Sequence, residues 1–126
     1  MALANLYAAW IGILLGFAAG AFQGLFFHRD DWLGGYAAWP RRMLRLGHIS
    51  FFGLALINFA YVLSVHLLEP KSLGLWPGRL FIVGAASMPL ICYLSAARKD
   101  FRHLFPNPVL ALHAGAVLFL FQGLFA

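Results

Sequence analysis

The sequence is poor in charge, and above all in acidic residues. Only 10% of its 126 residues are charged and 63% are hydrophobic, and four acidic residues stand against nine lysines and arginines. A chain of this length buries only part of its surface on folding, so a soluble domain could not hide so many apolar side chains. The composition excludes an ordinary soluble globular protein and indicates an integral membrane protein.

The sequence also lacks the short motifs of common enzymes. It contains no Walker loop, serine-nucleophile motif, HExxH pair or zinc-type cysteine spacing, and its single cysteine, Cys92, has no intrachain partner. No soluble basic surface is present for a nucleic acid. We therefore expect no nucleic-acid partner, and no enzymatic chemistry beyond electron transfer.

Long apolar runs are what the sequence does contain. A helix needs about 20 apolar residues to cross about 30 Å of hydrocarbon. Four runs meet this length, at about 2–27, 43–68, 77–97 and 108–126. The sequence predicts an all-α integral membrane protein, a single domain over 1–126 whose four transmembrane helices form an up-and-down bundle.

The basic residues predict the orientation of this bundle. Most of them lie in the first and third connections, as Arg29, Arg41, Arg42, Arg45, Arg98, Lys99 and Arg102. Cytoplasmic loops carry an excess of lysine and arginine, so these connections are expected in the cytoplasm and both termini on the outer side. The expected location is a bacterial inner membrane or an equivalent energy-transducing membrane. The expected partners are the lipid bilayer and either other membrane subunits or a second copy.

Glycine recurs at every fourth residue of the first run, at positions 12, 16, 20 and 24, and the next step reaches His28. Such a row usually allows close approach of another helix. It also leaves room for a large flat ring. Both interpretations stay open at the level of sequence.

The histidines are the main candidates for binding a metal or a cofactor within or beside the spans. None of the four acidic residues falls inside a span, which removes the usual carboxylate of a proton relay. His48 and His113 lie at similar depth in the second and fourth spans, near the cytoplasmic end. Helices two and four of an up-and-down bundle face each other across its diagonal. His48 and His113 are therefore predicted to be the two axial ligands of one haem b.

This arrangement of His48, His113 and the glycine row resembles the haem-carrying four-helix core of membrane b-type cytochromes. Gly20 and Gly24 are expected to leave clearance for the ring. No second histidine lies at the depth of His66 on the fourth span, so only one haem is expected. Paired donors for its propionates are expected from four arginines, namely Arg42, Arg45, Arg98 and Arg102.

Other polar residues have simpler explanations. His28 and His103 are alternative ligands for a transition metal, although every histidine near a membrane surface can also keep its polar tip in water. Gln23 and Asn58 lie within spans and are expected to hydrogen-bond between helices.

Three functions remain open from the sequence. The first is a small subunit of a larger redox complex, photosynthetic or respiratory, that holds one haem b near the cytoplasmic face and exchanges electrons with a quinone or another subunit. The second is a cofactor-free structural or assembly subunit that packs through its glycine row. The third is a small transporter of a metal or another solute.

Overall fold

The computed structural model describes residues 2–125, and that part of the chain is helical without any strand. Its four long helices are α1 (Ala2–Phe27), α2 (Trp39–Leu68), α3 (Trp76–Ala97) and α4 (Pro106–Phe119). Two 3₁₀ segments, η1 (Trp32–Gly34) and η2 (Lys99–Leu104), lie in the first and third connections. A π-helical turn, η3 (Leu120–Leu124), continues α4.

The four predicted spans are confirmed as four helical segments that are long and apolar enough to cross a membrane. The fourth segment, Lys99–Leu124, reaches this length by combining η2, α4 and η3. The boundaries differ by a few residues. α2 begins at Trp39 instead of 43, and α4 begins at Pro106 instead of 108. Both starts place a proline in the first turn, where its missing N–H breaks no helical hydrogen bond. Residue 126 of the fourth predicted span lies outside the described residues.

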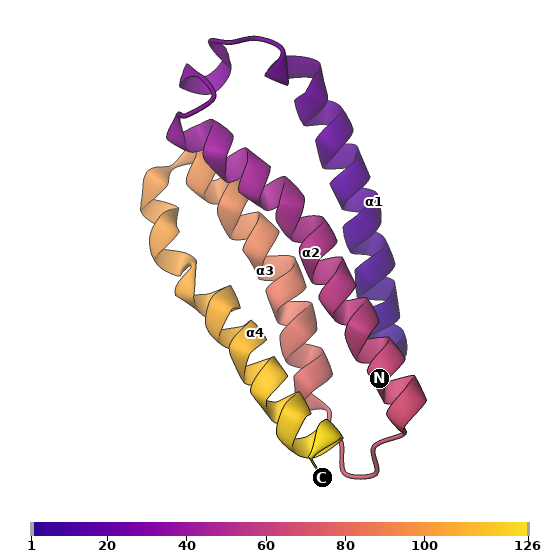
Figure 1. Ribbon diagram of the computed structural model, residues 1–126. Coiled ribbons are helices and arrows are strands. Elements are labelled where there is room, and N and C mark those ends of the chain that lie inside the picture. The colour runs from indigo at the N-terminus through magenta and orange to yellow at the C-terminus, as the bar shows by residue number, and fades with distance from the viewer. Residues whose placement is uncertain (1, 126) are drawn as a thin grey trace.

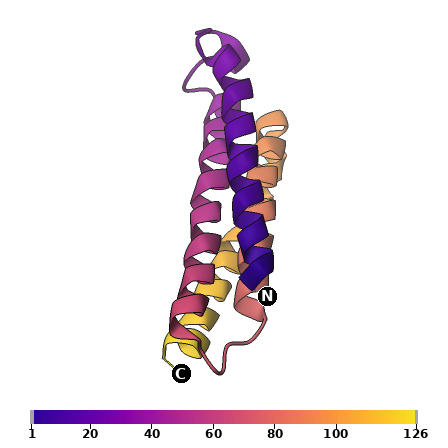
Figure 2. The same cartoon turned by 90° about the vertical axis from the view of Figure 1, so that its right-hand side faces the viewer.

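The helices alternate in direction, with α2 and α3 as a central pair and α1 and α4 on its two flanks (Figures 1 and 2). α1 packs mainly on α2, and α4 mainly on α3. α1 and α4 therefore lie far apart, on opposite flanks, and do not close the bundle. The second and fourth helices, which were expected to face each other, meet where the ring of Tyr61 on α2 contacts that of Phe119 on α4. We call the end with the first and third connections the connection end and the opposite one the terminal end.

Glycines explain why these particular helix pairs are close. Gly47 of α2 lies against Cys92 and Tyr93 of α3, and Gly84 of α3 lies against Leu112 of α4. In a membrane, small residues let helix backbones approach and gain van der Waals contact. Each consecutive pair of helices has such a contact, which favours the order of packing that is observed.

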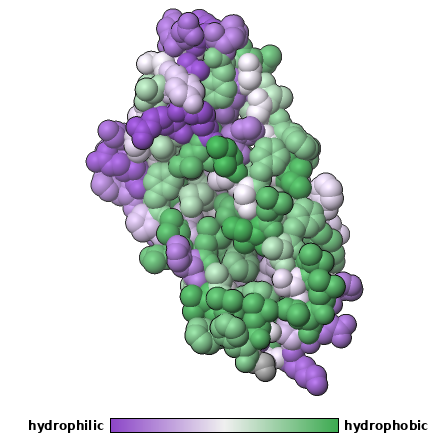
Figure 3. Space-filling view, viewed as in Figure 1, coloured by the Kyte–Doolittle hydropathy of each residue, from purple (hydrophilic) through white to green (hydrophobic). Residues whose placement is uncertain are grey.

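The outer surface of the four helices is largely apolar, and polar residues gather at the connection end (Figure 3). Large side chains such as Leu14, Phe17, Leu56 and Leu90 are each more than half exposed. A soluble protein rarely exposes so much continuous apolar surface. This surface suits the hydrocarbon of a bilayer.

Candidate functional site

A buried amide cluster joins three helices near the terminal end. Asn5 Nδ2 of α1 donates hydrogen bonds to Asn58 Oδ1 of α2 at 2.7 Å and to the Gly78 carbonyl of α3 at 2.9 Å. Asn58 Nδ2 donates in turn to the Leu54 carbonyl at 2.9 Å. Both asparagine side chains are fully buried. The cluster fixes α1, α2 and α3 against one another, since a polar group unpaired in hydrocarbon is costly.

A second set of interhelical hydrogen bonds lies at the other end of the same helices. Gln23 Nε2 of α1 donates to the Tyr93 hydroxyl of α3 at 2.6 Å. Trp39 Nε1, in the first turn of α2, donates to the Ser95 carbonyl of α3 at 2.8 Å. The interhelical bonds expected of Gln23 and Asn58 are thus present. The role of Asn5 was missed, because a single asparagine near the beginning of a span is equally compatible with the membrane surface.

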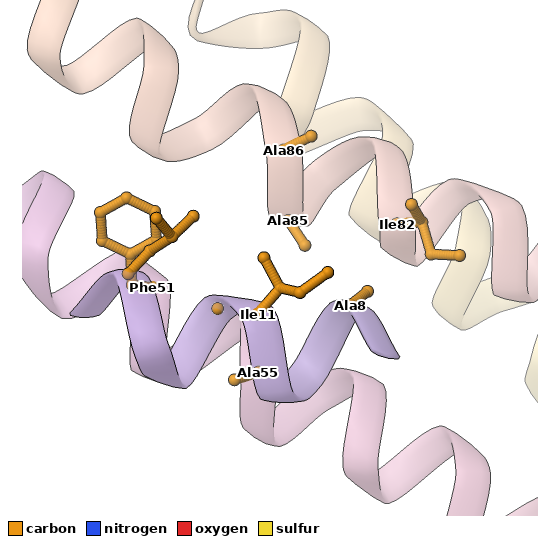
Figure 4. Close-up of a pocket in the computed structure, with 9 residues that line it drawn as sticks. Ala8, Ile11, Phe51, Ala55, Ile82, Ala85 and Ala86 are labelled. Atoms are coloured by element: carbon orange, nitrogen blue, oxygen red, sulfur yellow. The ribbon is translucent and has the colours of Figure 1, made fainter. Parts of the chain in front are cut away.

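Between these two sets of hydrogen bonds, the helices leave an apolar groove of about 380 Å³. The side chains of Ile11, Ile82 and Ala85 lie around the space between α1 and α3, above Ala55 of α2 (Figure 4). Small residues form much of its lining, including Ala8, Gly12 and Ala86. The groove contains no group able to transfer a proton or bind a metal.

A smaller hollow of about 250 Å³ lies between α2 and α4. Tyr61, Phe81 and Phe119 form part of its lining, and the ring of Tyr61 makes edge contacts with both phenylalanines at 5.4–5.5 Å. Neither this hollow nor the groove is lined by a histidine. The predicted haem ligands therefore belong to neither.

α2 covers most of the glycine row of α1. A Cβ built on Gly12 would lie 3.2 Å from the Phe51 carbonyl oxygen, and one on Gly16 would lie 2.7 Å from Phe52 Cζ. At Gly20 the corresponding distance to His48 Nε2 is 2.6 Å, whereas nothing lies within 4 Å at Gly24. The space at three of the four glycines is thus filled by α2 of the same chain.

His113 lies on the opposite flank of the molecule from this contact. It is exposed on α4, and its Nδ1 is 2.8 Å from the Val109 carbonyl oxygen, one turn earlier. A carbonyl can only accept, so this hydrogen bond assigns the proton to Nδ1 and leaves Nε2 free as an acceptor in the neutral ring. His48 faces α1 instead. In the described structure, His48 and His113 therefore do not face a common space in which one haem could lie between them.

The two alternative metal ligands, His28 and His103, lie at the surface, as does His66. Residues 2–125 contain no group of three or more His, Cys, Asp or Glu side chains placed to hold a metal. Three of the four expected propionate donors, Arg42, Arg98 and Arg102, are exposed, and the fourth, Arg45, lies over the ring of Tyr36 at 4.0 Å.

Arg41 is a polar residue whose role the sequence did not reveal. Only 3% of it is exposed, and its guanidinium lies 5.0 Å from the centroid of the Phe27 ring. Its Nη atoms donate to the carbonyls of Phe27 and Arg29, each at 3.1 Å. Phe27 is the last residue of α1, where the helix dipole is negative and favours a cation, and Arg29 lies two residues beyond it. Arg41 therefore caps α1, whereas its neighbours Arg42 and Arg45 remain near the surface.

No protein-family model, curated protein or solved structure matches this chain. Its function is therefore inferred from the contacts of its own residues.

Proposed function

We propose that this protein is a cofactor-free structural subunit of a larger integral-membrane complex. The observation that supports this most directly is the contact between α1 and α2. Gly12, Gly16 and Gly20 receive backbone or side-chain atoms of α2, so the row serves as a packing surface within the chain and leaves no slot for a planar ring there.

The internal hydrogen bonds support the same proposal. Asn5 and Asn58 at one end and Gln23 and Tyr93 at the other hold three helices together through bonds between their own side chains. Connections that are short relative to the helices leave no room for a soluble catalytic domain within residues 2–125. A rigid, largely apolar body of this kind suits a role as a packing element among other membrane subunits.

The second candidate is electron transfer through haem b, and one observation favours it. His113 donates Nδ1–H to a backbone carbonyl and leaves Nε2 free, which is how ligating histidines are commonly oriented. The position of His48 against Gly20 does not fit a haem shared by these two residues within one chain. In this candidate the second ligand to a haem on His113 comes from another chain of the complex.

A reduced-minus-oxidised visible spectrum separates the two candidates. The protein is purified in mild detergent, alone and with the subunits that accompany it, as wild type, His48→Ala and His113→Ala. The proposal expects no b-type band from this chain and the same copurifying subunits for all three proteins. A band lost only in His113→Ala would support the interchain haem. A band lost in both variants would establish the two-histidine haem and overturn the structural proposal.

Membership of a complex is tested separately. Wild-type protein solubilised from its native membrane is expected to migrate in native electrophoresis with a mass well above that of a dimer of 13.9 kDa chains. Migration as a monomer or dimer in several mild detergents would contradict the proposal. Thiol labelling from either side of sealed membranes, with cysteines placed in the connections, would test the predicted cytoplasmic position of the connection end.

A further inference from the structure

Charge is distributed very unevenly between the two ends of the molecule. Seven of the nine lysines and arginines lie in or beside the first and third connections, together with three of the four acidic residues. The terminal end has only Glu69, Lys71 and Arg79. The connection end thus has a net charge of +4 and the terminal end one of +1. Hydrophilic residues gather at the connection end in Figure 3.

Trp39 brings part of this charge together from segments far apart in the sequence. Its indole N–H binds the Ser95 carbonyl near the end of α3, and the Lys99 ammonium lies 5.1 Å from the centroid of its ring. Arg42 is exposed three residues later on α2, and residues three apart are neighbours on a helix surface. The first turn of α2 and the beginning of η2 therefore present Arg42 and Lys99 around one interfacial tryptophan.

Few of these cations have an acidic partner within the described chain. Among residues 2–125 the single ion pair joins Arg98 to Asp100 at 3.3 Å, with both side chains largely exposed. Arg42 and Lys99 are exposed at the ends of membrane spans, where headgroups lie and where tryptophan rings are favoured. Clusters of four to eight basic residues beside a span are typical of proteins that bind anionic lipids.

We propose that Trp39, Arg42 and Lys99 form a binding site for the headgroup of an anionic phospholipid. Charge complementarity selects this occupant, because the site offers two cations to a phosphate and an indole ring that settles at the headgroup level. The lipid then bridges α2 and η2, and so reinforces the contact between α2 and α3. This role does not depend on the structural function proposed above.

The test compares two double variants that each remove one arginine and one lysine. Arg42→Gln/Lys99→Gln removes the proposed site, and Arg79→Gln/Lys71→Gln removes the same charge at the terminal end. The pairs are matched in a further respect, since Lys99 lies over Trp39 and Arg79 lies 5.7 Å from the centroid of Trp76. Each protein is reconstituted with equal amounts of phosphatidylglycerol and phosphatidylcholine and extracted in mild detergent. Native mass spectrometry then gives the ratio of the two lipids that remain bound.

Wild type is expected to retain mainly phosphatidylglycerol, and less of it as salt is raised. The ratio should fall in Arg42→Gln/Lys99→Gln by about fivefold for each cation removed, and should be preserved in Arg79→Gln/Lys71→Gln. Equal retention of the two lipids by wild type, or an equal fall of the lipid ratio in both double variants, would rule out the proposed binding site. Circular dichroism and size-exclusion chromatography check that each variant is helical and monodisperse. If the double variant fails these checks, its two single variants are compared with the two single variants of the terminal end.

Discussion

Gly20 of α1 lies beneath the imidazole of His48 on α2, so close that a Cβ on Gly20 would be 2.6 Å from His48 Nε2. The residue expected to hold a haem thus occupies the space that the glycine was expected to leave for it. The contact also places His48 on the α1 side of the molecule, away from His113 on α4. It is the main reason that we favour a packing role over a haem held within one chain.

Substitution of Gly20 tests this contact directly. Gly20→Ala forces the His48 ring to move, and overpacking typically costs about 1–3 kcal/mol of unfolding free energy, against about 1 kcal/mol gained from helix propensity in water. Gly24→Ala is the matched control, because nothing lies within 4 Å of its added methyl group. Unfolding by SDS in mixed micelles, followed by circular dichroism, should show Gly20→Ala less stable than Gly24→Ala. Equal stability of the two variants would show that His48 is not fixed there.

The buried amide cluster should contribute measurably to stability. Asn58→Leu removes the acceptor of the 2.7 Å bond from Asn5 and leaves that amide with the Gly78 carbonyl alone. Interhelical hydrogen bonds in membranes are worth about 0.6 kcal/mol on average and up to about 1.7 kcal/mol, so a loss within this range is expected from SDS unfolding. Ser87→Ala serves as a control, because the Ser87 hydroxyl bonds only to Val83 of its own helix. An equal loss in both variants would contradict an interhelical role.

Arg41 and Arg42 are adjacent arginines with opposite environments. Arg41→Gln removes the charged donor from the carbonyl of Phe27, at the end of α1, and from that of Arg29 just beyond it. Hydrogen bonds to charged groups are worth about 1.5–3 kcal/mol each in soluble proteins. Arg42→Gln changes an exposed side chain, and we expect an effect within about 0.5 kcal/mol without anionic lipid. Arg41→Lys should restore little, since a single ammonium cannot reproduce the fork of guanidinium donors. Comparable unfolding free energies for Arg41→Gln and Arg42→Gln would rule out capping of α1 by Arg41.

The single cysteine offers a simple check on the packing of α2 against α3. Cys92 is fully buried, with its Cβ beside Gly47. A small maleimide should therefore label it very slowly in native micelles and fully in SDS. Cys92→Ala/Ala97→Cys moves the thiol to an exposed position at the end of α3 and should be labelled rapidly in both conditions. Fast labelling of native Cys92 would mean that α2 and α3 separate readily.

Much of the architecture is readable from the sequence alone. The number and approximate limits of the spans follow from runs of apolar residues, because hydropathy and length are local properties of the chain. The basic character of the connection end is likewise determined by composition. Gln23 and Asn58 were correctly expected to bond between helices, since a polar amide within hydrocarbon has few other ways to be satisfied.

Which side of each helix contacts which neighbour is visible only in the folded structure. A membrane helix that is apolar on all sides has no strongly marked polar face, so sequence periodicity does not show which side meets which neighbour. Contacts such as Asn5 with Asn58 and Gly20 with His48 join residues far apart in the chain and determine the order of packing. For the same reason Arg41 became a buried cap while Arg42 stayed exposed. Local composition thus specifies which segments are long and apolar enough to cross a membrane and where charge lies, and close packing between helices specifies which residues meet.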